Sequence, residues 1–557
     1  MRSTYLPLRA VSAAATAEAA RPEPLCARRA PPSFGRFTAL ALAALVAGCA
    51  SAPVVREAPA SRASTAAINM PLADPTIGLE MSAPRAAVLP SNSVLARDFM
   101  ELNFSLESGR PIPQFSRFEG PISVSLQGAV PPTAATELGR LVHRLNAEAH
   151  IPISTAAGAA NSITIAFVPK RDMVREVPNA ACFVVPNATS WEDYRANRRT
   201  ARGDWTQVRQ RTAATVFIPA ESTPQELRDC LHEETSQALG PLNDLYRLSD
   251  SVWNDDNFHA VLTRFDMMQL RAVYAPELHS GMSAPEVQAK LPAVFARINP
   301  GGGQVVGLRE DPTPRAYVNA MARAIGFGAQ SARKSAAMTA IQMSAAQGWH
   351  DSRAAFGWFA LGRLSVHDDP DTALAAFANA GAIYRATPGA GIQSAHVDMQ
   401  LAAFALSSGR ASDAIALVNR AIPQALSAEN AALMATLYLI RAEAYETLGA
   451  RDQAQQARLD SAQWARYGFG SDAAVRARCR GGSLGEGRGS VQLRRGCTPR
   501  LGKGAGGFRC FCLSSTHCAA MACPSARANT FRSSKGFPRV FVFMTPTDFT
   551  ISRVRPW

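Results

Sequence analysis

The residues best suited to chemistry lie in one stretch, Cys230-Leu-His232-Glu233-Glu234-Thr-Ser-Gln237-Ala-Leu-Gly240-Pro-Leu-Asn243-Asp244. Carboxylates and histidine can act as general bases or as metal ligands. Residues four apart share one face of a helix, so a zinc ion held by His232 would need its second ligand at position 236. That residue is a serine, which is not a zinc ligand. This register therefore predicts no zinc site.

In a shifted register the same stretch resembles the extended zinc-protease motif HExxHxxGxxH of the metzincin type. With the motif's glycine placed on Gly240, the three ligand positions are Glu233, Gln237 and Asn243. The position of the general base is then Glu234. Residues 233 and 237 lie one helical turn apart, and a turn at Gly240 returns residue 243 to the same point. The resemblance implies a zincin-like frame in which all three imidazoles are missing.

The downstream sequence extends this resemblance. Asp250-Ser-Val-Trp253-Asn resembles the stretch that carries the metzincin Met-turn, with Trp253 in place of Met, and 262–274 resembles the helix that follows in matrix-type enzymes. The whole set is similar to a bacterial family catalogued as domain of unknown function 2927. Its residues here are Cys182, Glu233-Glu234-x2-Gln237-Ala-Leu-Gly240, Asn243-Asp244, Asn254-Asp255, Leu270-Arg271-x2-Tyr274 and Gly281-Met282. That family has no established activity, so the resemblance implies a fold and leaves the function open.

Two interpretations of the degenerate ligand positions remain open. Glu, Gln and Asn offer hard oxygen atoms, which suit Ca²⁺ or Mg²⁺ better than Zn²⁺. Alternatively no metal binds, Glu233 and Glu234 are solvated helix residues, and Gln237 and Asn243 satisfy backbone groups around the turn. We favour the second interpretation and expect no cofactor. His232 and His259 are expected to be ordinary surface or core histidines.

The segment around these residues predicts an α+β domain. Alternating or continuous apolar runs predict strands at 121–126, 162–168, 182–185 and 214–218. An apolar stripe predicts a helix at 133–149, with Leu138, Leu141, Val142 and Leu145 on one face. A second helix should begin after Thr223, because Thr at the N-cap, Pro224 and Glu226 form a start signal, and should end at Gly240.

Cys182 and Cys230 are the two cysteines within this domain. In an exported protein an isolated pair predicts a disulfide, here between a strand and the helix. Two buried free thiols are the alternative.

The chain from 313 to 470 is rich in Ala and Leu with helical periodicity. Three motifs recur at steps of 41 and 40 residues, Ala373-x3-Phe377-x2-Ala380, Ala414-x3-Val418-x2-Ala421 and Ala454-x3-Arg458-x2-Ser461. Each follows an earlier helix, and small residues let two helices of a hairpin approach closely. The pattern resembles the tetratricopeptide repeat, although its period is longer than usual. A generic helical bundle is the alternative.

The N-terminal region predicts export. Arg36 precedes a short apolar run that ends in Val46-Ala47-Gly48-Cys49, which resembles the bacterial lipoprotein signal. The resemblance implies that Cys49 is lipidated and becomes the mature N-terminus; an ordinary signal peptide is the alternative. Residues 1–35 are long for such a signal, which a start codon assigned too far upstream explains. The Ala-, Pro- and Ser-rich stretch that follows is typical of a flexible tether.

The net charge of +14 is concentrated at the two ends of the chain. Residues 1–48 hold six arginines and two glutamates, and residues 479–557 hold thirteen basic and two acidic residues, so the intervening stretch carries −1. The charge therefore predicts no nucleic-acid partner. The tail also holds six of the ten cysteines, whose spacings match no standard zinc site. We favour a frameshifted or read-through translation from 479 over a genuine module.

These observations predict five segments and one function. The segments are an extension with the signal at 1–48, a tether at 49–93, a zincin-like domain at 94–305, tetratricopeptide-like helical repeats at 306–470 and a disordered tail at 471–557. The fold class is α+β, a zincin-like domain followed by an all-α helical-hairpin repeat domain. The expected function is non-catalytic binding or scaffolding at the periplasmic face of the cell envelope, anchored to the outer membrane through Cys49, with a protein partner on the repeats. The alternative is a metal-dependent hydrolase or peptidase with Glu234 as general base.

The first testable prediction concerns the lipid. Cys49→Ser should release the protein from membranes, because each buried methylene of an acyl chain contributes about 0.8 kcal/mol to anchoring. Membrane fractionation and labelled fatty acid incorporation measure this. A variant that stays on the membrane, with no label in the wild type, would contradict the prediction.

Overall fold

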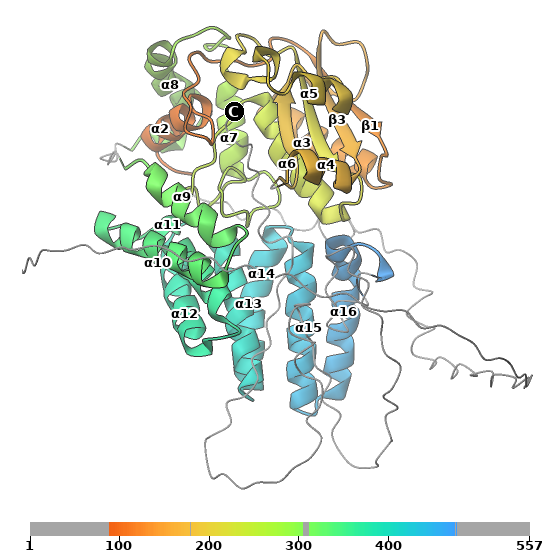
Figure 1. Ribbon diagram of the computed structural model, residues 1–557, viewed down its shortest axis with the longest axis vertical. Helices are drawn as coiled ribbons and strands as arrows, with labels where there is room; N and C mark the ends of the chain where they lie inside the picture. Colours follow the sequence, from red (N-terminus) through yellow and green to blue (C-terminus); the bar gives the residue numbers. More distant parts are fainter. Residues whose placement is uncertain (1–88, 179, 305–310, 474, 476–557) are drawn as a thin grey trace, which may run out of the picture. The chain divides into compact units, whose positions relative to one another are not determined.

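The computed structural model describes residues 89–178, 180–304, 311–473 and 475. The expected signal, Cys49 and the tail from 479 lie outside these residues. Within them a five-stranded sheet has the order β2-β1-β3-β5-β4 (Figure 1). Neighbouring strands are parallel except at one edge, where β4 runs antiparallel to β5. The strands are β1 (Ile122–Gly128), β2 (Ile153–Ser154), β3 (Asn161–Val168), β4 (Phe183–Pro186) and β5 (Ala213–Pro219).

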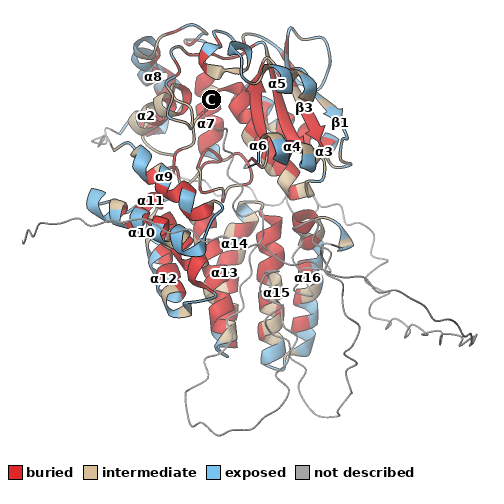
Figure 2. Ribbon diagram, viewed as in Figure 1, coloured by how far each residue is buried: buried red, intermediate tan, exposed pale blue. Residues whose placement is uncertain are grey.

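Strands β4 and β5 are buried along almost their whole length, and alternating residues of the sheet enter two different cores. On β3, Ile163 and Ile165 belong to the large core that includes residues of α3 (Ala134–Ala149) and α6 (Pro224–Leu239). Val168 belongs to a smaller core with residues of α4 (Lys170–Glu176) and α5 (Trp191–Asn197). This period of two follows from the pleat of a strand. Figure 2 shows that the middle of the sheet is buried, whereas the outer strand β1 is partly exposed.

The structure confirms the strands and helices expected for this part. The apolar stripe of α3 is buried, and α6 begins with the expected capping box. Thr223 accepts the Glu226 N–H, and the Glu226 carboxylate accepts the Thr223 N–H. Three further helices complete the large core, α2 (Asn92–Asn103), α7 (Arg264–Val273) and α8 (Ala284–Ile298). The sequence analysis identified only α7 among these three.

Helical hairpins follow, which confirms the predicted fold class. Helices α11 with α12, α13 with α14 and α15 with α16 pair, and neighbouring hairpins also pack together (Figure 1). Gly362 on α11 allows close approach, because a Cβ there would lie 2.8 Å from the Phe377 ring on α12. Gly409 and Gly449 occupy matching turns with φ of 75° and 76°. The helices are α9 (Arg315–Ile325), α10 (Gln330–Gln347), α11 (Ser352–Ser365), α12 (Pro370–Ala386), α13 (Gly391–Ser407), α14 (Ala411–Ser427), α15 (Ala431–Thr447) and α16 (Arg451–Phe469).

The loop between α6 and α7 enters the core of the helical part. Tyr246 packs edge-on against Tyr317, with ring centroids 5.5 Å apart. Phe258 contacts the rings of Phe359 at 5.1 Å and His396 at 4.8 Å. These contacts fix the chain that follows α6.

Polar contacts add to this junction. Gln225 at the start of α6 accepts the Ala432 N–H at 2.8 Å. The Tyr467 hydroxyl of α16 donates to the buried Glu137 carboxylate at 2.8 Å. The α+β part and the helical part therefore share one buried surface. No helix in the described ranges has both the length and the apolar character needed to cross a membrane.

The second prediction concerns pH. Burial raises the pKa of Asp256 from 3.8 to about 8, although Gln393 of α13 and the Phe258 N–H donate to its carboxylate. The folded protein then keeps a proton that the unfolded chain releases, so the free energy of unfolding falls as the pH rises from 3.8 to about 8. The melting temperature should therefore be higher near pH 5 than near pH 8.

Asp256→Asn should reduce this pH dependence without abolishing it. Burial also raises the pKa values of Asp229 and Asp266 to about 7, and their effect has the same sign. Asp452→Asn on the exposed start of α16 is the control and should keep the wild-type dependence. An Asp256→Asn variant with an unchanged pH dependence would show that this carboxyl does not hold the proton.

Candidate functional site

Helix α6 carries five of the residues singled out from the sequence, Cys230, His232, Glu233, Glu234 and Gln237. Glu234 is 1% exposed and Gln237 is 4% exposed, whereas Glu233 is half-buried. The helix ends at Gly240, where a Cβ would lie 2.9 Å from the Val273 side chain of α7. The absence of a side chain therefore lets the end of α6 pack against α7.

A buried guanidinium closes the C-terminal end of α6. Arg211 donates to the carbonyls of Gln237 and Ala238, both at 2.7 Å, and to the Gly240 carbonyl at 2.6 Å. These carbonyls have no partner within the helix, and a cation at this end is favoured by the helix dipole. Burial lowers the pKa of Arg211 to about 10, which still leaves it protonated at neutral pH.

The chain after Gly240 places Asp244 beside Gln237. The Gln237 amide nitrogen donates to the Asp244 carboxylate at 3.5 Å. Asn243 directs its amide nitrogen to the Glu101 carbonyl of α2 at 3.0 Å. Asp244, and not Asn243, therefore lies beside Gln237.

His232 of α6 and Trp253, which packs against this helix, are both buried. The Trp253 indole N–H donates to the Ser236 hydroxyl at 3.0 Å, and its side chain is fully buried. The His232 Nδ1 accepts the Leu262 N–H at 3.1 Å. Burial holds the pKa of His232 well below its usual value, so the ring is neutral at neutral pH. His232 is a core histidine and not part of the pocket lining. The His259 Nε2 lies 2.9 Å from the Ser249 carbonyl.

A pocket of about 380 Å³ opens beside α6. Glu234 and Gln237 of α6 line it, together with the edge strand β4 and the loop that follows α2. Segment 198–207 forms the remaining wall and includes two short 3₁₀ turns, η1 (Ala201–Gly203) and η2 (Trp205–Gln207). The pocket is thus built from four segments that are distant in sequence.

Carboxyl groups gather at the α6 side of this pocket. Burial raises the pKa of Glu234 well above its usual value, and the nearby charges of Glu233 and Asp244 raise it further. Burial likewise raises the pKa of Glu107, which lines the pocket, and of Asp244, although a hydrogen bond with Glu107 partly lowers the latter. The nearby Asp255 raises both values. These carboxyls therefore hold protons at pH values where exposed carboxyls are ionised.

The predicted disulfide between Cys182 and Cys230 is confirmed, with Cα atoms 6.0 Å apart. It joins the residue before β4 to α6, one turn before Glu233 and Glu234. Within the described part of the chain, one group of three potential metal donors is found, Cys182, Glu233 and Glu234. Since the Cys182 sulfur is bonded to Cys230, it is not a thiolate ligand. Two neighbouring carboxylates remain.

On the edge strand β4, both backbone polar groups of Val184 have hydrogen-bond partners. Its N–H donates to the Glu234 carboxylate, and its carbonyl accepts the Trp205 indole N–H at 3.4 Å. The guanidinium of Arg211 lies 4.8 Å from the Trp205 ring centroid. These contacts connect α6, the edge strand and the wall of the pocket.

Glu107, Trp205 and Arg211 belong to no motif that is visible in the sequence. Glu107 lies in a loop more than one hundred residues before α6, and no local pattern marks it. Arg198 and Arg199, a few residues before Trp205, are the feature of the sequence that could have indicated a polar wall of a binding site.

Comparisons with known proteins identify one similarity. Residues 92–293 match the model of a family described as "Protein of unknown function (DUF2927)". The expected resemblance to this domain is therefore supported over those residues. Searches of curated proteins and of solved structures gave no significant match.

The third prediction concerns the disulfide. Cys230→Ser should lower the free energy of unfolding by about 4 kcal/mol, because the bond closes a loop with a sequence separation of 48. The melting temperature should fall by about 10 °C. Cys182→Ser should have the same effect, and the double variant should be no less stable than either. Unchanged melting of the wild type in reductant would contradict the prediction.

Proposed function

We propose that this chain is a lipid-anchored protein of the bacterial cell envelope whose α+β domain binds a ligand without catalysing a reaction. The pocket beside α6 is its ligand site. The helical repeats bind a protein partner, so the chain holds a ligand and a partner together. The anchor is Cys49 at the end of the Val46-Ala47-Gly48-Cys49 signal, and it places the protein at the periplasmic face, on the outer membrane.

The residues at the three zinc-ligand positions support the proposal that this domain does not catalyse a reaction. A catalytic zinc needs three protein ligands and one open position for water. The corresponding positions hold Glu233, Gln237 and Asn243, and the Asn243 amide nitrogen is engaged by the Glu101 carbonyl. Neutral amide oxygens are weak zinc ligands, because they do not compete with water as imidazole does. Since Glu233 is the one carboxylate at these positions, the site is not suited to hold a zinc ion and its catalytic water.

Two features support descent from a metallopeptidase-like frame. Glu233 and Gln237 occupy one face of a helix that ends at Gly240, as the degenerate motif requires. Trp253, at the place of the Met-turn residue, lies against this helix through Ser236. The frame is zincin-like in this proposal, and its pocket has been kept while its ligands have been replaced.

A metal-dependent hydrolase or peptidase is the second candidate, because Glu234 lies in a pocket and its pKa is raised. A carboxyl with these properties is typical of a general acid or base. Hydrolysis would still need an activated water. Glu233, Gln237 and Asn243 are not suited to hold the metal ion that would activate it. We therefore rank this function below ligand binding.

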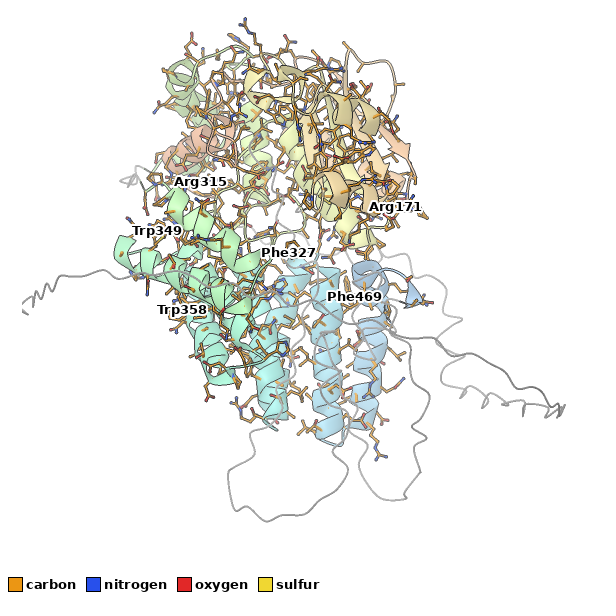
Figure 3. All side chains as sticks on the ribbon, in the orientation of Figure 1. Arg171, Arg315, Phe327, Trp349, Trp358 and Phe469 are labelled. Atoms are coloured by element: carbon orange, nitrogen blue, oxygen red, sulfur yellow. A yellow bond between two sulfur atoms is a disulfide. The ribbon has the colours of Figure 1, made fainter. Side chains whose placement is uncertain are left out.

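The exposed apolar side chains support a partner on the helical part. Within the described residues, five of seven large apolar side chains that are exposed belong to this part, Phe327, Met338, Leu374, Leu448 and Leu459. Phe327, in the turn that connects α9 to α10 and labelled in Figure 3, is 91% exposed. Aromatic residues are enriched at protein–protein interfaces.

The fourth prediction tests the absence of catalysis. Protein purified without chelator should contain no stoichiometric zinc by elemental analysis, because the three ligand positions lack imidazoles. It should also cleave no member of a broad peptide library. Glu234→Gln is the matched variant and should behave like the wild type in both assays. Stoichiometric zinc, or cleavage that Glu234→Gln abolishes, would favour the hydrolase.

A further inference from the structure

Glu234, a residue of the pocket wall, has a buried carboxyl oxygen without a partner. Its carboxyl accepts the Val184 N–H, whereas Oε1 makes no hydrogen bond within the described structure. The side chain is 1% exposed and lines the pocket. A buried acceptor without a partner is costly, so its retention indicates a bound group that donates to it.

The surroundings of Glu234 favour a cation. Glu107 lines the same pocket, and Asp244 is hydrogen-bonded to both Glu107 and Gln237. The charged groups that act most strongly on Glu234 are Glu233 and Asp244, both acidic. A positive group placed among these carboxyls would lower their pKa values and so favour the ionised form that binds it.

The donor arrangement favours an ammonium group over a metal ion. Calcium needs six to eight oxygens gathered within about 2.6 Å of one point. Among the residues that the structure describes, the three potential metal ligands that lie close together are Cys182, Glu233 and Glu234. Because the Cys182 sulfur is part of a disulfide, only the two glutamates of this group could bind a metal ion. An ammonium has three N–H donors on a flexible stem and can serve acceptors that are further apart.

The walls fit an aliphatic chain attached to that ammonium. Leu106, Trp205 and Leu242 line the pocket, which suits the methylenes of such a chain. Arg110, Arg198 and Arg199 also line it. Arg110 is held by Asp204 at 2.7 Å, and Arg198 by Glu176 at 2.6 Å. These ion pairs give the pocket a polar wall in addition to its apolar one.

We propose that the pocket binds a primary ammonium on an aliphatic chain, as in the side chain of lysine or of another diamino acid, with Glu234 Oε1 as its acceptor. The inference rests on the proposed function, in which the pocket binds a ligand without turnover. The ligand is either a free amino acid derivative or a residue of a peptide, and both present the same ammonium.

Calorimetry on the full chain tests this with two matched probes. Nα-acetyl-L-lysine should bind with one site, and Nα-acetyl-L-norleucine, which lacks the ammonium, should bind about tenfold more weakly or worse. Glu234→Gln should weaken lysine binding by a similar factor and leave norleucine binding unchanged. Glu192→Gln, on the exposed face of α5 outside the pocket, should bind as the wild type does. Melting curves check that each variant is folded.

The outcomes separate this inference from the proposed function. Equal binding of the two probes, or a Glu234→Gln variant that binds lysine normally, overturns the ammonium site and leaves a ligand pocket. Glu234-dependent binding of CaCl₂ without lysine binding replaces the ammonium by a metal. Cleavage of peptides overturns the proposed function itself. Acetyl-Ala-Lys-Ala-amide distinguishes a peptide ligand from a free amino acid derivative. Tighter binding of this peptide than of Nα-acetyl-L-lysine supports an ammonium carried by a peptide, and weaker binding supports a free amino acid derivative.

Discussion

The position of the candidate site depends on the buried guanidinium of Arg211. Its hydrogen bonds to three carbonyls end α6, and its backbone joins Phe118 through an isolated parallel bridge. Its face stacks on Trp205, which in turn holds Val184 of the edge strand. One side chain therefore connects the helix that carries Glu234 to the two walls opposite it. Without this cation the helix would end in buried carbonyls that lack partners, which is costly.

The other end of α6 and the chain that follows it are fixed in the same way by tertiary contacts. The disulfide holds Cys230 to the start of β4, and Gln225 contacts α15 of the helical part. After Gly240 the chain enters the helical core through Tyr246 and Phe258. The loop 240–263 therefore joins the pocket beside α6 to the core of the helical part. In the proposed function, this loop links the ligand site to the part of the chain that binds a partner.

The parts that could be predicted from sequence depend on local periodicity. The capping box at Thr223, the shared face of Glu233 and Gln237 and the pairing of Cys182 with Cys230 each follow from spacing or from composition. The role of Arg211 does not, because its partners are carbonyls on a distant helix. Nor does the proximity of Asp244 to Gln237, since it depends on how Gly240 packs against Val273. Glu107 is the clearest case: the loop that carries it reaches the pocket only because α2 packs into the large core.

We propose that the acidic side of the pocket takes the ammonium of a ligand and not a catalytic metal. A crystal structure of the full chain with Nα-acetyl-L-lysine, recorded at the zinc absorption edge, distinguishes the two. The lysine Nζ should lie within hydrogen-bond distance of Glu234 Oε1, the methylenes should lie along Leu106 and Leu242, and no anomalous peak should appear beside Glu233. An anomalous peak between Glu233 and Gln237, or a lysine whose ammonium points away from Glu234, would contradict the ammonium site.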